Sequence, residues 1–336
     1  MLNFTVSKSS DKQDCFSTIG EALSQIPTDN SQPVTIFIAS GIYHEKLEIS
    51  RPFVTLTGEN KDNTIITYDD HATQLMPDGS KRGTFRSYTM LLDGSDITLS
   101  NLTIRNGSAP RSTAGQSIAL YADGDRIIIK NCRLESYQDT LFTGPLPPSA
   151  LTPGGFTGPK EFAPRICGRQ YYKDCYICGD IDFIFGSATA YFESCDIASV
   201  YSETLPPDKD GNSPVYGYVT AASTPEGQSY GYVFDNCRFT GTCPDKSVYL
   251  GRPWRNFAKT VLLNCRLGSH IKPEGFHDWN KKDAWNTLFY AEYQSTGEGA
   301  AFPECRAPFV SQLTKAEAAS YTKESVLSGK DGWNPN

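Results

Sequence analysis

The sequence predicts an all-β solenoid, in which short strands stack coil upon coil into parallel sheets. The first observation is a repeated pattern of a polar residue, then Cys, then an apolar residue two positions after the Cys. Five segments carry it and a sixth has Leu in place of Cys; their polar residues are Asn101, Asn131, Asp174, Ser194, Asn236 and Asn264. The second observation is their spacing of 30, 43, 20, 42 and 28 residues. Short alternating apolar segments at such intervals, separated by turns, fit stacked coils better than a sandwich.

The remaining elements follow along the chain. Apolar residues at helical spacing over 16–26 predict a short helix that caps the N-terminal end. The alternating runs 34–38 and 54–57 predict the earliest coils. A helix-prone stretch over 313–327 predicts a second helical cap near the C-terminus. Length alone suggests about two domains. The repeats instead favour one domain that covers residues 1–336.

The ten cysteines need a separate explanation. Asn, Asp or Ser at a bend tolerates the left-handed backbone, and the Cys that follows can act as a small inward-facing apolar residue. We therefore predict reduced core cysteines; the alternative, a disulfide framework, is typical of short secreted chains. Cys175 and Cys178 resemble half of a zinc site, but a structural site needs four ligands. We expect no metal and no cofactor, so a chelator should leave activity unchanged.

Composition excludes some partners and says less about location. A net charge of −7 counts against a nucleic-acid partner, which would need a basic surface. No apolar run reaches the length of a membrane helix, so we expect no membrane partner either. The first residues show no signal peptide, which predicts a cytoplasmic protein, or an extracellular one if a leader was removed. We expect a monomer.

A Pro/Gly-rich loop interrupts the repeat at residues 144–164, which hold six prolines and four glycines. Loops this long are usually functional or disordered. Gln116 and Gln138 are 22 residues apart, while Asp139 and Asp182 are 43 apart, or 22 without the 21 residues of the loop. Both steps equal about one coil. Because neighbouring parallel strands lie about 4.8 Å apart, these side chains can stack as one polar column.

Two carboxylates on adjacent coils would have very different pKa values, because like charges that close resist ionising together. One would keep its proton as an acid, and the other would stay ionised as a base or nucleophile. The alternative is structural, with Asp139 capping one turn and Asp182 starting another. Spacing alone leaves both interpretations open.

Local segments at these positions favour the first interpretation. They are Gly-Ile-Tyr-His-Glu at 41–45, Gln-Ser-Ile-Ala-Leu at 116–120, Tyr-Gln-Asp-Thr-Leu at 137–141, Asp-Phe-Ile-Phe-Gly at 182–186 and Leu-Gly-Arg-Pro-Trp at 250–254. In this order they closely resemble the signature segments of pectin methylesterases, carbohydrate esterases built on a single-stranded right-handed parallel β-helix. Residues 289–297 are similar to that family's C-terminal segment, and the resemblance covers roughly residues 14–310.

The resemblance implies hydrolysis of galacturonate methyl esters in pectin or methylated oligogalacturonides, with release of methanol. Asp182 would be the nucleophile, and Asp139 the general acid that protonates methanol and later activates water. Gln116 and Gln138 would bond the developing oxyanion, and Arg252 would hold Asp182 ionised. Fixed amide donors suit a tetrahedral oxyanion. The alternative for the two glutamines is a purely structural ladder that bonds the solenoid backbone.

The resemblance also implies a sugar-binding surface. Phe142, Phe185 and Trp254 would line the groove, where flat aromatic rings suit the apolar faces of sugars. The alternative places all three in the core. The four histidines show no partner pattern that suggests catalysis, and we expect no role for them; they are His44, His71, His270 and His277.

The loop at 144–164 departs from the family pattern, since relatives continue almost directly to the next coil. We expect it to overhang the groove and close its end, which favours short methylated oligogalacturonides over long polymer. Two other functions remain open. One is a β-helix polygalacturonase or pectate lyase, although the acids here come paired with glutamines, which suits an ester oxyanion better. The other is a non-catalytic solenoid that binds glycans.

Overall fold

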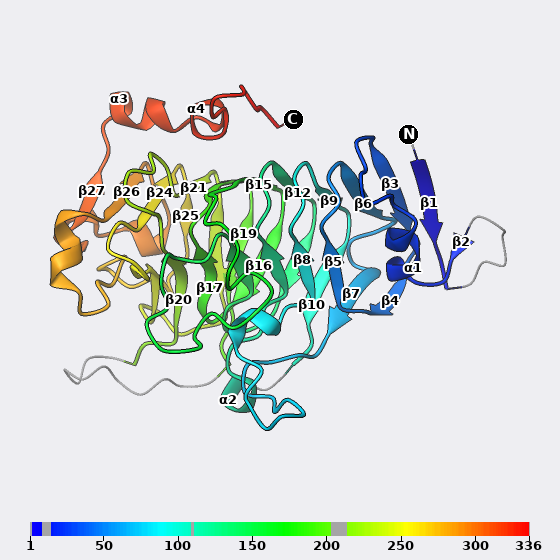
Figure 1. Cartoon of the computed structure of the whole chain (residues 1–336). Coiled ribbons are helices and arrows are strands. Elements are labelled where there is room, and N and C mark those ends of the chain that lie inside the picture. Colours follow the sequence, from blue (N-terminus) through cyan, green and yellow to red (C-terminus); the bar gives the residue numbers. More distant parts are fainter. Residues whose placement is uncertain (1, 9–14, 109–110, 203–213, 336) are drawn as a thin grey trace.

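Three parallel sheets run the length of the molecule (Figure 1). The computed structural model describes residues 2–8, 15–108, 111–202 and 214–335. Every pairing between its named strands is parallel, which confirms the predicted parallel β-helix. The strands β3 and β6 coincide with the predicted runs at 34–38 and 54–57.

Strand order shows how the coils stack. The twelve-stranded sheet has the order β2 (Cys15–Phe16), β1 (Leu2–Val6), β3 (Val34–Ile38), β6 (Val54–Gly58), β9 (Thr98–Ser100), β12 (Ile127–Lys130), β15 (Arg169–Lys173), β18 (Thr189–Glu193), β21 (Tyr232–Asp235), β24 (Lys259–Leu263), β26 (Phe289–Tyr293) and β27 (Val310–Gln312). The eight-stranded sheet has the order β25 (Arg266–Leu267), β22 (Arg238–Gly241), β19 (Asp196–Ser199), β16 (Tyr176–Gly179), β13 (Arg133–Glu135), β10 (Thr103–Asn106), β7 (Thr64–Tyr68) and β4 (Gly41–His44). The seven-stranded sheet has the order β23 (Val248–Gly251), β20 (Gly217–Ala222), β17 (Ile181–Gly186), β14 (Leu141–Thr143), β11 (Leu120–Ala122), β8 (Met90–Leu92) and β5 (Leu47–Ile49). One coil, such as β12, β13 and β14, therefore contributes one strand to each sheet.

The repeated polar residue lies at the bend between the twelve-stranded and eight-stranded sheets. All six of these residues have a left-handed backbone, with φ between 49° and 56°. Asn131 Nδ2 donates to Asn101 Oδ1 at 2.7 Å, one coil away. The predicted bend is therefore confirmed, because Asn, Asp and Ser reach this conformation more easily than branched residues.

The cysteine after each bend points into the core. Cys132, Cys175, Cys195, Cys237 and Cys265 are all buried, and the thiols of the chain are free. Most of these thiols donate to a main-chain carbonyl of the preceding coil, as Cys237 Sγ does to Phe192 O at 3.4 Å. The prediction of inward-facing core cysteines is therefore confirmed. Aromatic rings stack in the same way, with Tyr172, Phe192 and Phe234 at centroid distances of 4.6 and 4.5 Å.

The N-terminal helix is α1 (Ile19–Ser24), shorter than predicted. Thr18 and Glu21 form a capping box at its start, and Ile19 and Ala22 are buried against the first strands. Glu45 also holds the helix, because its carboxylate accepts the N–H groups of Ile19 and Gly20 at 3.0 and 2.9 Å. The remaining helices are α2 (Arg111–Ala114), α3 (Lys315–Ala318) and α4 (Lys323–Leu327), with short 3₁₀ turns η1 (Thr84–Arg86), η2 (Lys282–Asn286), η3 (Glu298–Ala300), η4 (Pro303–Cys305) and η5 (Ala319–Tyr321).

The C-terminal helices lie alongside the coils rather than over the last one (Figure 1). α4 packs against β18, and its Val326 and Leu327 are buried with Tyr171 and Tyr191. The predicted helical stretch is therefore present, but it covers the outer face of the twelve-stranded sheet. The physical reason is that this outer face is apolar here and must be shielded from water. No helix in the described ranges is long and apolar enough to cross a bilayer.

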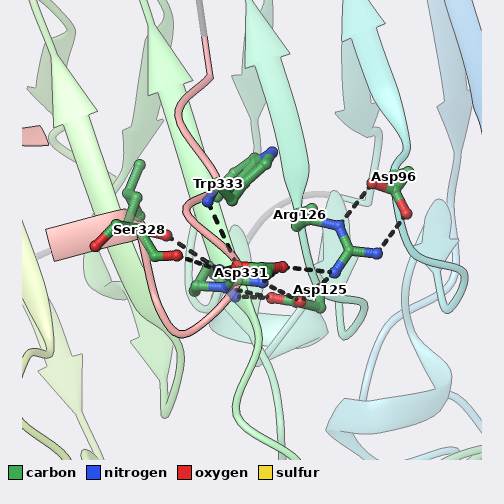
Figure 2. A network of polar contacts seen from close by, with 8 residues as sticks. Asp96, Asp125, Arg126, Ser328, Asp331 and Trp333 are labelled. Atoms are coloured by element: carbon green, nitrogen blue, oxygen red, sulfur yellow. Dashed lines mark hydrogen bonds and ion pairs between the residues drawn. The ribbon is translucent and has the colours of Figure 1, made fainter. Parts of the chain in front are cut away.

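An ionic network fastens the chain after α4 to the middle of the solenoid (Figure 2). Asp331 accepts hydrogen bonds from Arg169 Nη2 at 2.9 Å and from Arg126 Nη1 at 3.3 Å. Arg169 also donates to the carbonyls of Leu327 and Ser328 at 3.2 and 3.1 Å. Arg169 begins β15, the first strand after the inserted loop, so this strand and the C-terminal segment share one anchor.

We expect Arg169→Ala to release the C-terminal segment, because it removes several charge-assisted hydrogen bonds at once. Trypsin should then cut after the exposed Lys330 roughly tenfold faster, since cleavage follows the population of the opened form. Mass spectrometry of timed digests measures this. Arg238→Ala, which breaks the exposed pair with Asp196, is the matched control and should change nothing. Equal rates for wild type and Arg169→Ala would contradict the role of the network.

Candidate active site

A cavity of about 250 Å³ opens beside the seven-stranded sheet. Its lining residues are Thr84, Phe85, Gln116, Gln138, Asp139, Gly155, Asp182, Phe185, Ala221, Arg252, Trp254 and Trp279. Seven of the eight predicted site residues are among them, and Phe142 is the exception. The fold therefore brings together residues that lie as far apart in the sequence as Gln116 and Trp254.

Gln116, Gln138, Asp139 and Asp182 form the predicted polar column. Gln116 and Gln138 pair directly in a parallel bridge. Asp139 N–H donates to Ile181 O at 3.1 Å, which sets Asp139 beside Asp182 on the next coil. The two carboxylates therefore lie one coil apart, as the spacing without the 21 loop residues predicts.

The backbone at both aspartates is unusual. Asp139 has φ 67° and Asp182 has φ 49°, both in the left-handed region. The register between β17 and β20 also shifts between Ile181 and Ile184, which is a bulge at Asp182. Bulges and left-handed residues redirect side chains and are concentrated at functional sites.

Arg252 holds Asp182 in a two-pronged ion pair. Its Nε and Nη2 donate to the two oxygens of Asp182 at 2.8 and 2.7 Å. This fork geometry matches an ionised carboxylate. The guanidinium lies between the rings of Tyr218 and Trp279, 3.8 Å from each centroid, which fixes its plane and adds cation–π attraction. Gly251 is required before it, since a Cβ there would lie 1.9 Å from Thr220 Oγ1.

Asp139 lies in a different environment from Asp182. Burial raises the pKa of Asp139 well above its ordinary value, and the negative charge of Asp182 raises it further, although Arg252 opposes both. The side chain of Asp139 makes no hydrogen bond within the described residues, so no hydrogen bond there stabilises its charge. The two neighbouring carboxyl groups are thus set for opposite protonation states.

The side-chain amides of Gln116 and Gln138 form no hydrogen bond with any residue that the structure describes, yet both line the cavity. Gln170 differs, since its amide donates to Ala122 O at 2.8 Å and serves the backbone. Two unengaged amides beside two carboxyl groups can donate to an oxygen of a bound ligand. This arrangement does not fit the alternative of a structural ladder.

Aromatic side chains form the walls. Phe185 and Trp254 line the cavity as predicted, at a centroid distance of 5.8 Å. The prediction for Phe142 is corrected: its side chain is fully buried and does not line the cavity. Its ring packs beneath those of Phe85 and Phe185, at centroid distances of 5.1 and 4.9 Å. These two rings line the cavity and separate Phe142 from it. Phe142 therefore supports the wall and cannot contact a ligand directly.

Sequence reasoning missed Phe85, Tyr218 and Trp279. Phe85 and Trp279 come from irregular segments, where no periodicity marks a side chain as facing a site. Trp279 could have been suspected because tryptophan is rare here: the chain has only four, and two of them line this cavity. No histidine lines it, although His277 lies behind the wall and its Nδ1 accepts the N–H of Trp279 at 2.9 Å. The described residues contain no group of three or more His, Cys, Asp or Glu placed to hold a metal ion.

Comparisons with known proteins show the family to which the chain belongs. The family model described as Pectinesterase matches residues 3–145 and 165–330. The chain therefore belongs to the pectinesterase family. The residues between the two matched segments, 146–164, fall within the Pro/Gly-rich loop.

Individual relatives extend the comparison. Pectinesterase A of Dickeya chrysanthemi is 34% identical, over 99% of this chain and 92% of its own. Probable pectinesterase/pectinesterase inhibitor 23 of Arabidopsis thaliana is 31% identical over 95% of this chain, which spans only 51% of that relative. Two solved structures each have a TM-score of 0.78 and 33% identity, covering 100% of this chain and 99% of theirs. They are pectin methylesterase PemA from Erwinia chrysanthemi and a pectin methylesterase in complex with hexasaccharide VII.

The same substitution, Asp to Asn, should shift the free energy of unfolding in opposite directions at Asp139 and Asp182. Asp139→Asn should raise the free energy of unfolding at pH 8, because it removes a carboxyl group whose ionisation is disfavoured by burial and by the charge of Asp182. The folded state binds the Asp139 proton more tightly than the unfolded state. The gain should therefore shrink as the pH falls from 8 towards the ordinary aspartate pKa of about 4.

Asp182→Asn should instead lower the free energy of unfolding by about 3 kcal/mol, since it leaves the Arg252 guanidinium without its counter-charge. Urea denaturation of both variants between pH 4 and 8 measures the two effects. If both substitutions changed stability in the same direction at pH 8, the assigned charge states would be wrong.

Proposed function

We propose that this protein is a pectin methylesterase, which hydrolyses galacturonate methyl esters of pectin or methylated oligogalacturonides and releases methanol. The observation that carries the proposal is the contrast between Asp139 and Asp182 on adjacent coils. Asp139 favours its proton, Asp182 is paired with Arg252, and two free amides lie beside them. The names of the relatives support the same activity.

In the first half-reaction, an oxygen of Asp182 attacks the carbonyl carbon of the ester. The carbonyl electrons move to oxygen, and the amide N–H groups of Gln116 and Gln138 stabilise this oxyanion. When the intermediate collapses, the bond to the methoxy oxygen breaks, and Asp139 gives its proton to that oxygen. Methanol leaves, and the galacturonate acyl group remains on Asp182 as a mixed anhydride.

In the second half-reaction, Asp139 is a carboxylate and takes a proton from water as a general base. The hydroxide oxygen attacks the acyl carbon, and the same two amides stabilise the second oxyanion. The bond to Asp182 breaks, which restores its carboxylate in the fork of Arg252. The products are a galacturonic acid unit, which then loses its proton to solvent, and Asp139 with its proton restored.

Two other functions predict different products. Glycosidic hydrolysis would use the two carboxyl groups on either side of the bond between sugars, and a lyase would typically need calcium and a basic residue. Neither gives the amides of Gln116 and Gln138 a role. A non-catalytic glycan-binding solenoid would need no proton on Asp139.

Wild-type protein should release methanol from methylated pectin or its oligomers without forming new reducing ends or an ultraviolet-absorbing product. Asp182→Asn should lower methanol release at least about a thousandfold, as loss of a nucleophile does in other enzymes. Gas chromatography measures methanol, and circular dichroism checks the fold. A folded Asp182→Asn protein that retained a tenth of the wild-type rate would exclude this mechanism.

The amides are tested separately with Gln116→Leu. We expect kcat to fall about 100- to 1000-fold with little change in KM, because the oxyanion exists only in the transition state and intermediate. Gln25→Leu, at an exposed position on the N-terminal side, is the control and should keep full activity. A rise in KM at unchanged kcat would mean that Gln116 binds the ground state instead.

A further inference from the structure

The inserted loop lies against the catalytic cavity. It leaves the seven-stranded sheet after β14 and returns to the twelve-stranded sheet at β15, and residues 146–164 fall outside the family match. Gly155, near its centre, lines the cavity together with Asp139 and Asp182. The loop thus adds to the pectinesterase scaffold a surface that directly borders the reacting groups.

Phe156 spans the two aromatic walls. Its ring lies 5.6 Å from Phe85 and 6.1 Å from Trp254, both measured between centroids. Phe85 precedes β8 and Trp254 follows β23, and β14 and β17 lie between these strands in the sheet. Phe156 is buried in this contact, so it joins the N-terminal wall of the cavity to the C-terminal wall.

Several contacts hold the loop in this position. Lys160 forms ion pairs with Asp93 and Asp123, the latter at 3.2 Å. Arg255 Nη2 donates to Ser149 O at 2.8 Å, which ties the loop to the residue after Trp254.

Directly after the loop, Arg165 donates to four carbonyls within it, those of Pro147, Lys160, Glu161 and Ala163. A Cβ at Gly158 would lie 2.8 Å from Phe85 O, so the loop backbone packs directly on the wall. The loop is a fixed part of the cavity, packed by its own side chains as Ω-loops are.

We propose that this loop closes one side of the catalytic cavity and makes the enzyme selective for short methylated oligogalacturonides over polymeric pectin. The inference rests on the proposed function. A chain that continued between the two walls on the loop side would meet Phe156 and Gly155. The cavity of about 250 Å³ lies between these walls, and Gly155 of the loop borders it.

The test compares kcat/KM per methyl ester on methylated trimers to hexamers with kcat/KM on polymeric pectin of the same degree of methylation. Wild type should favour the oligomers. Phe156→Ala and a variant lacking residues 146–164 should each raise the polymer-to-oligomer ratio about 10- to 100-fold, the range that one pocket contact contributes to discrimination. Phe162→Ala, in the same loop but 93% exposed, is the matched control and should leave the ratio unchanged.

A wild-type enzyme that turned over polymer faster per ester than the oligomers would overturn the proposal, as would an unchanged ratio in folded Phe156→Ala. Should the deletion variant fail to fold, Phe156→Ala decides the question. Failure of the proposed function gives a different result, because no substrate of any length would then yield methanol.

Discussion

Main-chain hydrogen bonds between successive coils fix the distance between them at one parallel-strand spacing, about 4.8 Å. The site depends on this spacing. It sets Gln138 beside Gln116 and Asp139 beside Asp182, on a scaffold that cannot stretch to relieve the repulsion between two carboxylates. In the proposed reaction one of the two keeps its proton, and the ion pair between Arg252 and Asp182 leaves that proton to Asp139.

The surroundings of the column maintain this difference in charge. Tyr218 and Trp279 hold the plane of the Arg252 guanidinium, and His277 in turn holds the main chain of Trp279. Burial leaves Asp139 little exposed to water, which strengthens the electrostatic effects on it. The left-handed backbone at both aspartates is a local cost, and the hydrogen-bonded coils around them stabilise it.

Much of the fold could be predicted because the repeat records a physical need at every coil. A left-handed bend favours Asn, Asp or Ser, and the core position behind it favours an apolar residue such as Cys237. The polar column could be predicted because its residues are spaced by about one coil along the sequence. The position of α4 could not be predicted, because helix propensity does not say which surface a helix will cover. Phe142 was misplaced because the resemblance on which its prediction rested cannot separate the inner layer of an aromatic cluster from its outer layer. Phe85 and Phe156 come from irregular segments, whose positions depend on tertiary contacts alone.

The central claim is that Asp139 carries a proton at neutral pH while Asp182 does not. The most direct measurement is a carbon-13 NMR titration of the aspartate carboxyl groups in the resting enzyme, with Asp139→Asn used to assign the signal. We expect a carboxyl resonance that titrates well above the ordinary aspartate pKa of about 3.9 and is missing in Asp139→Asn. If the Asp139 resonance titrated at or below that value, Asp139 would be ionised in the resting enzyme and could not serve as the general acid.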